Sequence, residues 1–289
     1  MIDRSIMRNR IIVSEKPLFI TILIAVIITG GLTISSLRTT NPTSILCTFI
    51  NSQSQSQTQT LPNHPTTTHF SAIMYYATAR GVAAQQTLPE IQTIFHLLQT
   101  LAPCNLLVFG IGHESLMWSA FNTRGTTLFL EDDIKSVQKI LANAPTLRVH
   151  HTAYETRLSD ADSLLAAYKT TAKCLPPQVY LKGNTECKLA LSKLPEEVYR
   201  REWDVIMIDG PRGYYEEAPG RMAVIFTAAV MARRREGAGD THVLVHDVNR
   251  KVEQEYAEEF LCRSNLVKAE NRLWHFKIPP AAKDSPTFC

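Results

Sequence analysis

The sequence lacks two patterns that commonly mark a protein's chemistry or processing. No Cys-x-x-Cys pair and no Cys/His spacing typical of a zinc site occurs in its 289 residues. No Asn-x-Ser/Thr sequence with x other than proline is present either. Because both patterns are absent, we expect neither a structural zinc site nor N-linked glycans.

An excess of positive charge is also missing from most of the chain. Its 30 Lys and Arg and 27 Asp and Glu give a net charge of +3. The first 74 residues have five basic and two acidic side chains, 5 − 2 = +3, so residues 75–289 have 25 of each and are neutral. Because affinity for a phosphate backbone comes from clustered Lys and Arg, these residues do not predict a nucleic-acid-binding protein. The hydrophobic fraction of 45% supports a single α/β domain instead.

A long apolar segment lies near the N-terminus, where residues 17–37 carry no charge. About 20 residues of helix cross the roughly 30 Å hydrocarbon layer of a membrane. Basic residues precede the segment and only Arg38 follows it closely, which places residues 1–16 in the cytosol by the positive-inside rule. A cleaved signal peptide is the alternative. The pattern favours a type II transmembrane anchor.

A polar region follows, and residues 39–79 contain no charged side chain. Ser-Gln and Thr-Gln repeats within residues 51–68 cannot bury enough apolar surface to offset their ordering entropy. We therefore predict a flexible, disordered stem over residues 38–74 and a lumenal domain over residues 75–289. A short tail, an anchor, a stem and a neutral domain are together typical of Golgi-resident glycan-modifying enzymes.

Six cysteines suit an oxidising lumen, where disulfides persist. Cys174 and Cys187 lie close together in a loop with Pro, Gly and Asn, so they are our first candidates for a pair. Spacing alone does not fix the other pairs, because six cysteines allow about 15 connectivities.

After residue 89, segments with apolar residues at helical spacing alternate with short, continuous apolar runs. Helical spacing predicts helices at residues 90–101, 160–168, 221–235 and 250–261, and two more that pass through residues 116–118 and 140–141. Short apolar runs predict strands at residues 106–109, 127–130, 147–153, 204–208, 241–245 and 273–278. This alternation indicates a Rossmann-like α/β domain, with a mostly parallel sheet covered by helices on both faces. Ligands of such sheets bind outside the carboxyl ends of the strands.

Glycines follow the first predicted strand, at Gly110 and Gly112. They allow the backbone to turn tightly and to approach a ligand closely. Glu131 ends the second strand, where it is placed to accept hydrogen bonds from ribose hydroxyls, and Asp132 follows it. A plain strand-to-helix turn is the alternative. Either NAD or S-adenosylmethionine fits the pattern, but Ser115 replaces the third glycine of the dinucleotide fingerprint, which favours S-adenosylmethionine because it has no phosphates.

Ionisable residues follow two later strands, with Asp209 after one and His246 and Asp247 at the end of the other. A histidine or carboxylate can accept the proton of a hydroxyl that attacks a sulfonium methyl group. Asp209 and Asp247 could instead hold a divalent cation through their oxygens. His246 could also merely cap the next helix.

Arginine is the residue type best suited to bind a sugar carboxylate, because its guanidinium donates two parallel hydrogen bonds. Arg221 opens a predicted helix, and Arg212 and Arg124 compete with it for this role. Tyr214 lies in the same turn as Arg212 and is a further candidate for binding the substrate.

Long segments of the domain carry a family resemblance. The clearest are PCNLLVFGIGHESLMWSAFN, TTLFLEDD, KCLPPQVYLKGNTECKLAL, EWDVIMIDGPRGYYEEAPGRMAVIFTAAVMARRR and THVLVHDVNRKVE. They resemble the plant family of glucuronoxylan and arabinogalactan 4-O-methyltransferases, with the related irregular-xylem-15 proteins, over residues 75–280. The resemblance implies a Golgi membrane protein of type II that transfers a methyl group from S-adenosylmethionine to O4 of glucuronic acid side chains on a cell-wall glycan.

The resemblance also implies roles for residues. Gly110, Gly112 and Glu131 would bind the methyl donor, and the residues after the later strands would line the reaction centre. We expect a direct displacement in which His246 or Asp247 accepts the O4 proton while an arginine anchors the glucuronate carboxylate. The alternatives are a non-catalytic Golgi protein needed for xylan biosynthesis and a lumenal NAD-dependent sugar oxidoreductase.

Overall fold

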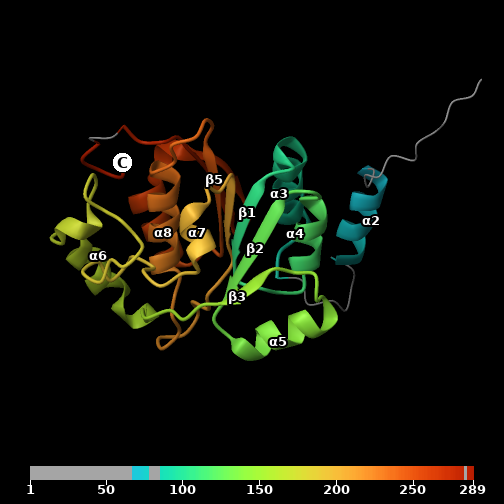
Figure 1. Cartoon of the computed structure of the whole chain (residues 1–289), viewed down its shortest axis with the longest axis horizontal. Helices are drawn as coiled ribbons and strands as arrows, with labels where there is room; N and C mark the ends of the chain where they lie inside the picture. The colour runs from blue at the N-terminus through green and yellow to red at the C-terminus, as the bar shows by residue number, and fades with distance from the viewer. Residues whose placement is uncertain (1–66, 78–84, 283–284) are drawn as a thin grey trace, which may run out of the picture. The chain divides into compact units, whose positions relative to one another are not determined.

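The computed structural model describes residues 67–77, 85–282 and 285–289 (Figure 1). The described residues all belong to one compact unit. The predicted cytosolic tail, the anchor at residues 17–37 and the stem up to residue 66 lie outside the described residues. None of the helices within the described ranges combines the length and the hydrophobicity that a membrane crossing needs.

A mixed sheet of seven strands, in the order β3-β2-β1-β4-β5-β7-β6, forms the centre of the described domain. The first five strands of the chain pair in parallel, and β7 pairs antiparallel with β5 and β6. The strands are β1 (Asn105–Phe109), β2 (Thr126–Glu131), β3 (Val149–His151), β4 (Val205–Ile208), β5 (Thr241–His246), β6 (Leu266–Glu270) and β7 (Leu273–Ile278). The expected parallel strands are confirmed, whereas β6 was not predicted because this edge strand alternates little and is mostly exposed.

Helices cover both faces of this sheet, as the sequence predicts. They are α2 (Thr67–Ala77), α3 (Leu88–Leu101), α4 (Ser115–Phe121), α5 (Ile134–Asn143), α6 (Ala161–Tyr168), α7 (Glu196–Arg200), α8 (Met222–Arg233) and α9 (Lys251–Ala257). Figure 1 shows α3 and α4 on one side of the sheet and α8 on the other. Successive strand residues point to opposite faces. Leu107 and Phe109 therefore pack in the core under α6, α8 and α9, while Leu106 and Val108 pack under α3 and α4.

The folded region begins earlier than predicted, because the boundary set at residue 75 falls inside α2. Phe70, Ile73 and Met74 recur at helical spacing and contact the core formed with α3 and α4. The ring of Phe70 lies 5.5 Å from that of Phe95 and 5.3 Å from that of Phe121. Residues 67–74 of the predicted stem therefore lie in α2, where an apolar stripe outweighs the lack of charge.

Two disulfides occur among the described residues. Cys174 pairs with Cys187, which confirms the predicted bond, and Cys262 pairs with Cys289. Phe288, next to the C-terminal cysteine, packs against Phe226 and Phe260. The second bond thus fixes the end of the chain on the core beside α8.

Replacing both Cys174 and Cys187 with serine should lower the free energy of unfolding by about 3 kcal/mol, because the bond removes loop entropy from the unfolded chain. Urea denaturation of the purified full-length protein measures this loss. The Cys262→Ser/Cys289→Ser variant should lose at least as much, since its bond spans 27 residues rather than 13. Unchanged urea midpoints would contradict the expected contribution.

Candidate active site at the carboxyl edge of the sheet

A cleft of about 490 Å³ follows the carboxyl ends of the central parallel strands. This volume is typical of small-molecule sites. The predicted site residues that line it are Gly110, Glu131, Asp132, Asp209, Arg212, Tyr214, Arg221, His246 and Asp247. Gly112 lines a small adjoining cavity. A wider cavity of about 600 Å³ lies elsewhere, at the C-terminal end of α8, where Arg234 already donates to the carbonyl of Val179.

The loop after β1 touches the loop after β4 at two glycines. Gly110 has φ +101°, and a Cβ on it would lie 2.9 Å from the backbone nitrogen of Gly210. Only glycine combines this backbone conformation with so close an approach. The glycine predicted from the sequence therefore shapes the end of the cleft between β1 and β4.

Glu131 holds this glycine loop in place from the end of β2. Its Oε2 accepts a hydrogen bond from the backbone N–H of Ile111 at 2.9 Å, and its Oε1 accepts one from Asp133 at 3.0 Å. Burial raises the pKa of Glu131, and the two backbone N–H groups oppose that rise. Carboxylate oxygens have further lone pairs, so Glu131 and the adjacent Asp132 can still accept hydrogen bonds from a ligand in the cleft. Their predicted contact with the methyl donor stays a prediction.

Arg221 is buried at the N-terminus of α8, with 4% of its side chain exposed. Its guanidinium donates to the backbone carbonyls of Asp209 at 2.9 Å, of Pro211 at 3.2 Å and of His246 at 2.6 Å. It also pairs with the carboxylate of Asp247 at 2.9 Å. The sequence predicts that Arg221 binds a sugar carboxylate, but the structure uses its donors to join the ends of β4 and β5, because the side chain faces the protein interior.

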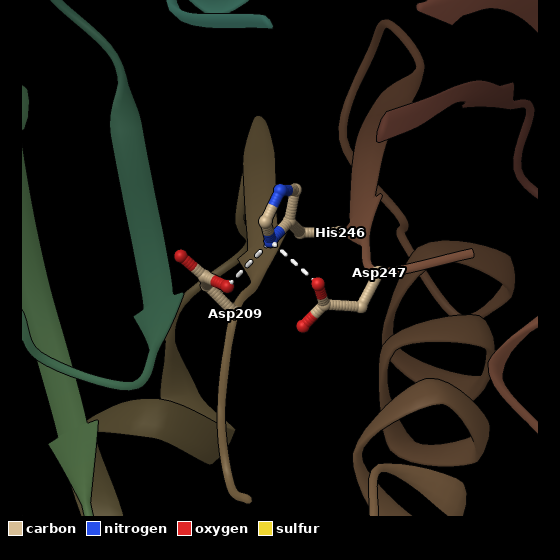
Figure 2. A group of neighbouring side chains, drawn as sticks. All are labelled: Asp209, His246 and Asp247. Carbon is tan, nitrogen blue, oxygen red and sulfur yellow. Dashed lines mark hydrogen bonds and ion pairs between the residues drawn. The ribbon is translucent and has the colours of Figure 1, made fainter. Parts of the chain in front are cut away.

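His246 lies between acidic side chains, as Figure 2 shows for Asp209 and Asp247. Its Nδ1 lies 2.9 Å from Asp209 Oδ1, and its Nε2 faces Glu90 Oε2 at 3.7 Å. Only 2% of the His246 side chain is exposed. Burial acts to raise the pKa of Asp209, but the hydrogen bond with His246 and the charge of Arg221 outweigh it and leave that pKa below its ordinary value. Asp209 is thus held ionised.

Sequence reasoning missed the segment that enters α3. Gln86 donates to Asp209 Oδ2 at 3.1 Å. Glu90 is fully buried and accepts hydrogen bonds from the backbone N–H groups of Thr87 at 2.6 Å and Arg272 at 2.8 Å. The Thr-x-x-Glu pattern of a helix capping box was readable in the sequence. Its contacts with His246 in β5 and with Arg272 just before β7 were not, because they join residues far apart in the chain.

Asp247 lies in the left-handed region, with φ +61°. Besides its pair with Arg221, its carboxylate lies 3.0 Å from Arg250 Nη2 and 2.9 Å from Arg272 Nη1. A positive φ is uncommon for residues other than glycine and often occurs at functional sites. Here it places one carboxylate among three guanidinium groups.

Asp209, His246 and Asp247 could offer three ligand atoms within 4.8 Å of one another to a metal ion. Carboxylate and imidazole ligands suit several divalent cations. In the described conformation, however, the three arginines around Asp247 occupy its oxygens and oppose a further positive charge. A cation would have to displace some of them, so its predicted binding at Asp209 and Asp247 stays a prediction.

Comparison with known proteins places the chain in a known sequence family. The family model described as IRX15/IRX15L/GXM matches residues 89–276. The chain is 50% identical over 279 residues to Arabinogalactan O-methyltransferase 1 of Arabidopsis thaliana, with 96% of each chain covered. It is 44% identical over 211 residues to Glucuronoxylan 4-O-methyltransferase 1 of the same plant, with 72% of each covered. It is 40% identical over 227 residues to Protein IRREGULAR XYLEM 15, with 77% of this chain and 70% of that one covered.

Substituting Gly110 with alanine should disrupt the cleft more than an equivalent change elsewhere. Gly239 is the matched control, because its φ of +96° is similar but nothing lies within 4 Å of an added Cβ. We expect Gly110→Ala to lower the melting temperature further than Gly239→Ala and to abolish binding of S-adenosylmethionine in calorimetry. Equal effects of the two substitutions on both measurements would contradict a close contact at Gly110.

Proposed function

This chain belongs to the IRX15/IRX15L/GXM family, and we propose that it transfers a methyl group from S-adenosylmethionine to O4 of glucuronic acid side chains on a plant cell-wall glycan. Two O-methyltransferases of plant glycans are 50% and 44% identical to it. The described domain has a Rossmann-like α/β fold, and the cleft lies at its ligand-binding edge. Arabinogalactan is the first acceptor to assay and glucuronoxylan the second, because the arabinogalactan relative matches over more of the chain.

The observation that carries this proposal is the position of Asp209. Its ionised carboxylate lies in the cleft between the glycine loop after β1 and the residues that end β5. When bound, S-adenosylmethionine supplies a methyl group on a positively charged sulfur. A carboxylate at this place can orient the attacking hydroxyl and accept its proton.

We assign the proton acceptor to Asp209 rather than to the residues expected from the sequence. His246 is almost fully buried and its Nδ1 already contacts Asp209, so its role is to orient the Asp209 carboxylate. Asp247 is already paired with three arginines. In the proposed reaction the sugar O4 forms a bond with the methyl carbon, the carbon–sulfur bond breaks, and the O4 proton passes to Asp209 and then to solvent.

We further propose that the protein acts in the Golgi lumen as a type II membrane protein anchored by residues 17–37. The charge asymmetry around that segment supports this orientation. The two disulfides of the described domain also support it, because such bonds persist in oxidising compartments.

The proposed function is tested by incubating the full-length protein with S-adenosylmethionine carrying a labelled methyl group and with de-methylated glycans. Mass spectrometry should find the label on O4 of glucuronic acid. No transfer, together with no binding of S-adenosylmethionine in calorimetry, would favour the non-catalytic alternative, and nicotinamide binding would favour the oxidoreductase.

Asp209→Asn should lower kcat by about 10²- to 10⁴-fold, the usual contribution of a general base, and leave S-adenosylmethionine bound. The control is Asp240→Asn, since Asp240 pairs with Lys277 outside the cleft. If Asp209→Asn kept nearly the kcat of the unmodified protein, the proton would have another acceptor.

A further inference from the structure

Charge is distributed unequally along the cleft. Glu131 and Asp132 lie at the end of β2, beside the glycine loop. Arg250 and Arg272 lie at the other end, next to α9 and β7. The antiparallel direction of β7 explains the position of Arg272, because the start of this strand lies at the edge where the parallel strands end. The cleft therefore has an acidic half and a basic half, with Asp209 between them.

Each half suits one of the two molecules that the proposed reaction brings together. A sulfonium donor is cationic and fits the acidic half beside the glycines. A glucuronic acid residue is anionic and fits the basic half. This placement would bring the donor methyl group and the acceptor hydroxyl to Asp209 from opposite sides.

The two arginines that the sequence favours for binding the carboxylate are poorly placed for it. Arg221 is buried and its donors serve the loops after β4 and β5. Arg212 is exposed, but its Nη2 lies 3.8 Å from Asp133 Oδ2, at the acidic end of the cleft. Neither presents free N–H groups in the basic half.

Arg272 is held in place by several hydrogen bonds, and its side chain is still open to the cleft. Its backbone N–H donates to Glu90 Oε1 at 2.8 Å, and its carbonyl accepts from the N–H of Val248 at 3.1 Å. Its Nη1 donates to Asp247 Oδ1 at 2.9 Å and its Nη2 to the carbonyl of Gln85 at 2.7 Å. The side chain is still 40% exposed. A guanidinium has five N–H donors, so further ones remain for a ligand.

Arg250 completes the basic half from the other side of Asp247. Its Nη2 lies 3.0 Å from Asp247 Oδ2 and its Nη1 lies 3.4 Å from Glu253 Oε1, while 28% of the side chain is exposed. Its guanidinium also lies 5.9 Å from the centre of the exposed ring of Tyr214. Asp247 thus fixes two guanidinium groups at one end of the cleft, beside an aromatic surface.

We propose that Arg272, with Arg250 beside it, binds the carboxylate of the glucuronic acid acceptor and thereby selects uronic acids over neutral hexoses. This inference rests on the proposed methyl transfer and names the part of the site that reads the acceptor. The planar guanidinium of arginine matches a carboxylate in two parallel hydrogen bonds, which a lysine cannot reproduce.

The test compares two acceptors that differ only in the carboxyl group: a glucuronic-acid-bearing glycan and the same glycan after carboxyl reduction to glucose. The unmodified full-length protein should prefer the uronic acid acceptor. Arg272→Gln should raise KM for that acceptor by roughly 10- to 100-fold, the effect of losing a charged hydrogen bond, with little change in kcat. Its preference over the reduced acceptor should fall by the same factor.

Two further variants control for charge and for folding. Arg272→Lys keeps the positive charge but lacks the two parallel N–H donors of a guanidinium, so it should recover only part of the preference. Arg200→Gln removes an exposed arginine of α7 outside the cleft and should change nothing. Calorimetry with S-adenosylmethionine should give the same affinity for all variants, which shows that the donor half is intact.

The outcomes separate this inference from the proposed function. If the unmodified protein methylates neither acceptor, both are wrong. If it methylates the uronic acid acceptor and Arg272→Gln keeps the full preference, only the assignment of Arg272 is overturned. An equal loss of kcat on both acceptors would also overturn it, because that result indicates a structural role instead.

Discussion

The buried guanidinium of Arg221 joins the parts of the chain on which the site depends. It donates to carbonyls after β4 and at the end of β5, and it pairs with the carboxylate of Asp247. A buried charge is costly unless it is paired and hydrogen-bonded. Loss of any of these partners would therefore destabilise the folded protein. Because Arg221 directly precedes α8, the same interaction sets where that largely buried helix begins on the sheet. The arrangement of Asp209, His246 and Asp247 therefore depends on this one side chain.

The cleft that results can position two ligands of opposite charge without a charged surface on the domain as a whole. Acidic side chains lie beside the glycine loop, and arginines lie where β7 begins. Residues 75–289 are neutral overall, so long-range attraction of an acidic glycan would be weak. Recognition would depend instead on a few arginines whose positions are fixed by carboxylates such as Asp247.

Much of this arrangement could be predicted from the sequence, because buried parallel strands are uninterrupted apolar runs and ligands bind at their carboxyl ends. That rule brought Gly110, Glu131 and Asp209 to one cleft. It could not show that Arg221 is buried, because the sequence around an arginine before a helix is the same whether its side chain faces a ligand or the core. Nor could it find Glu90 and Arg272, which meet across 182 positions of sequence. The folded α2 was missed because uncharged sequence was taken as disordered despite its apolar stripe.

The most direct test of this account is a crystal structure of the protein with S-adenosylhomocysteine, the product of the donor. We expect its ribose hydroxyls to bind Glu131, its homocysteine part to lie along the loop at Gly110, and its sulfur to face Asp209. A nucleoside bound instead at Arg250 and Arg272, with Glu131 contacting only the backbone, would contradict the division of the cleft into a donor half and an acceptor half.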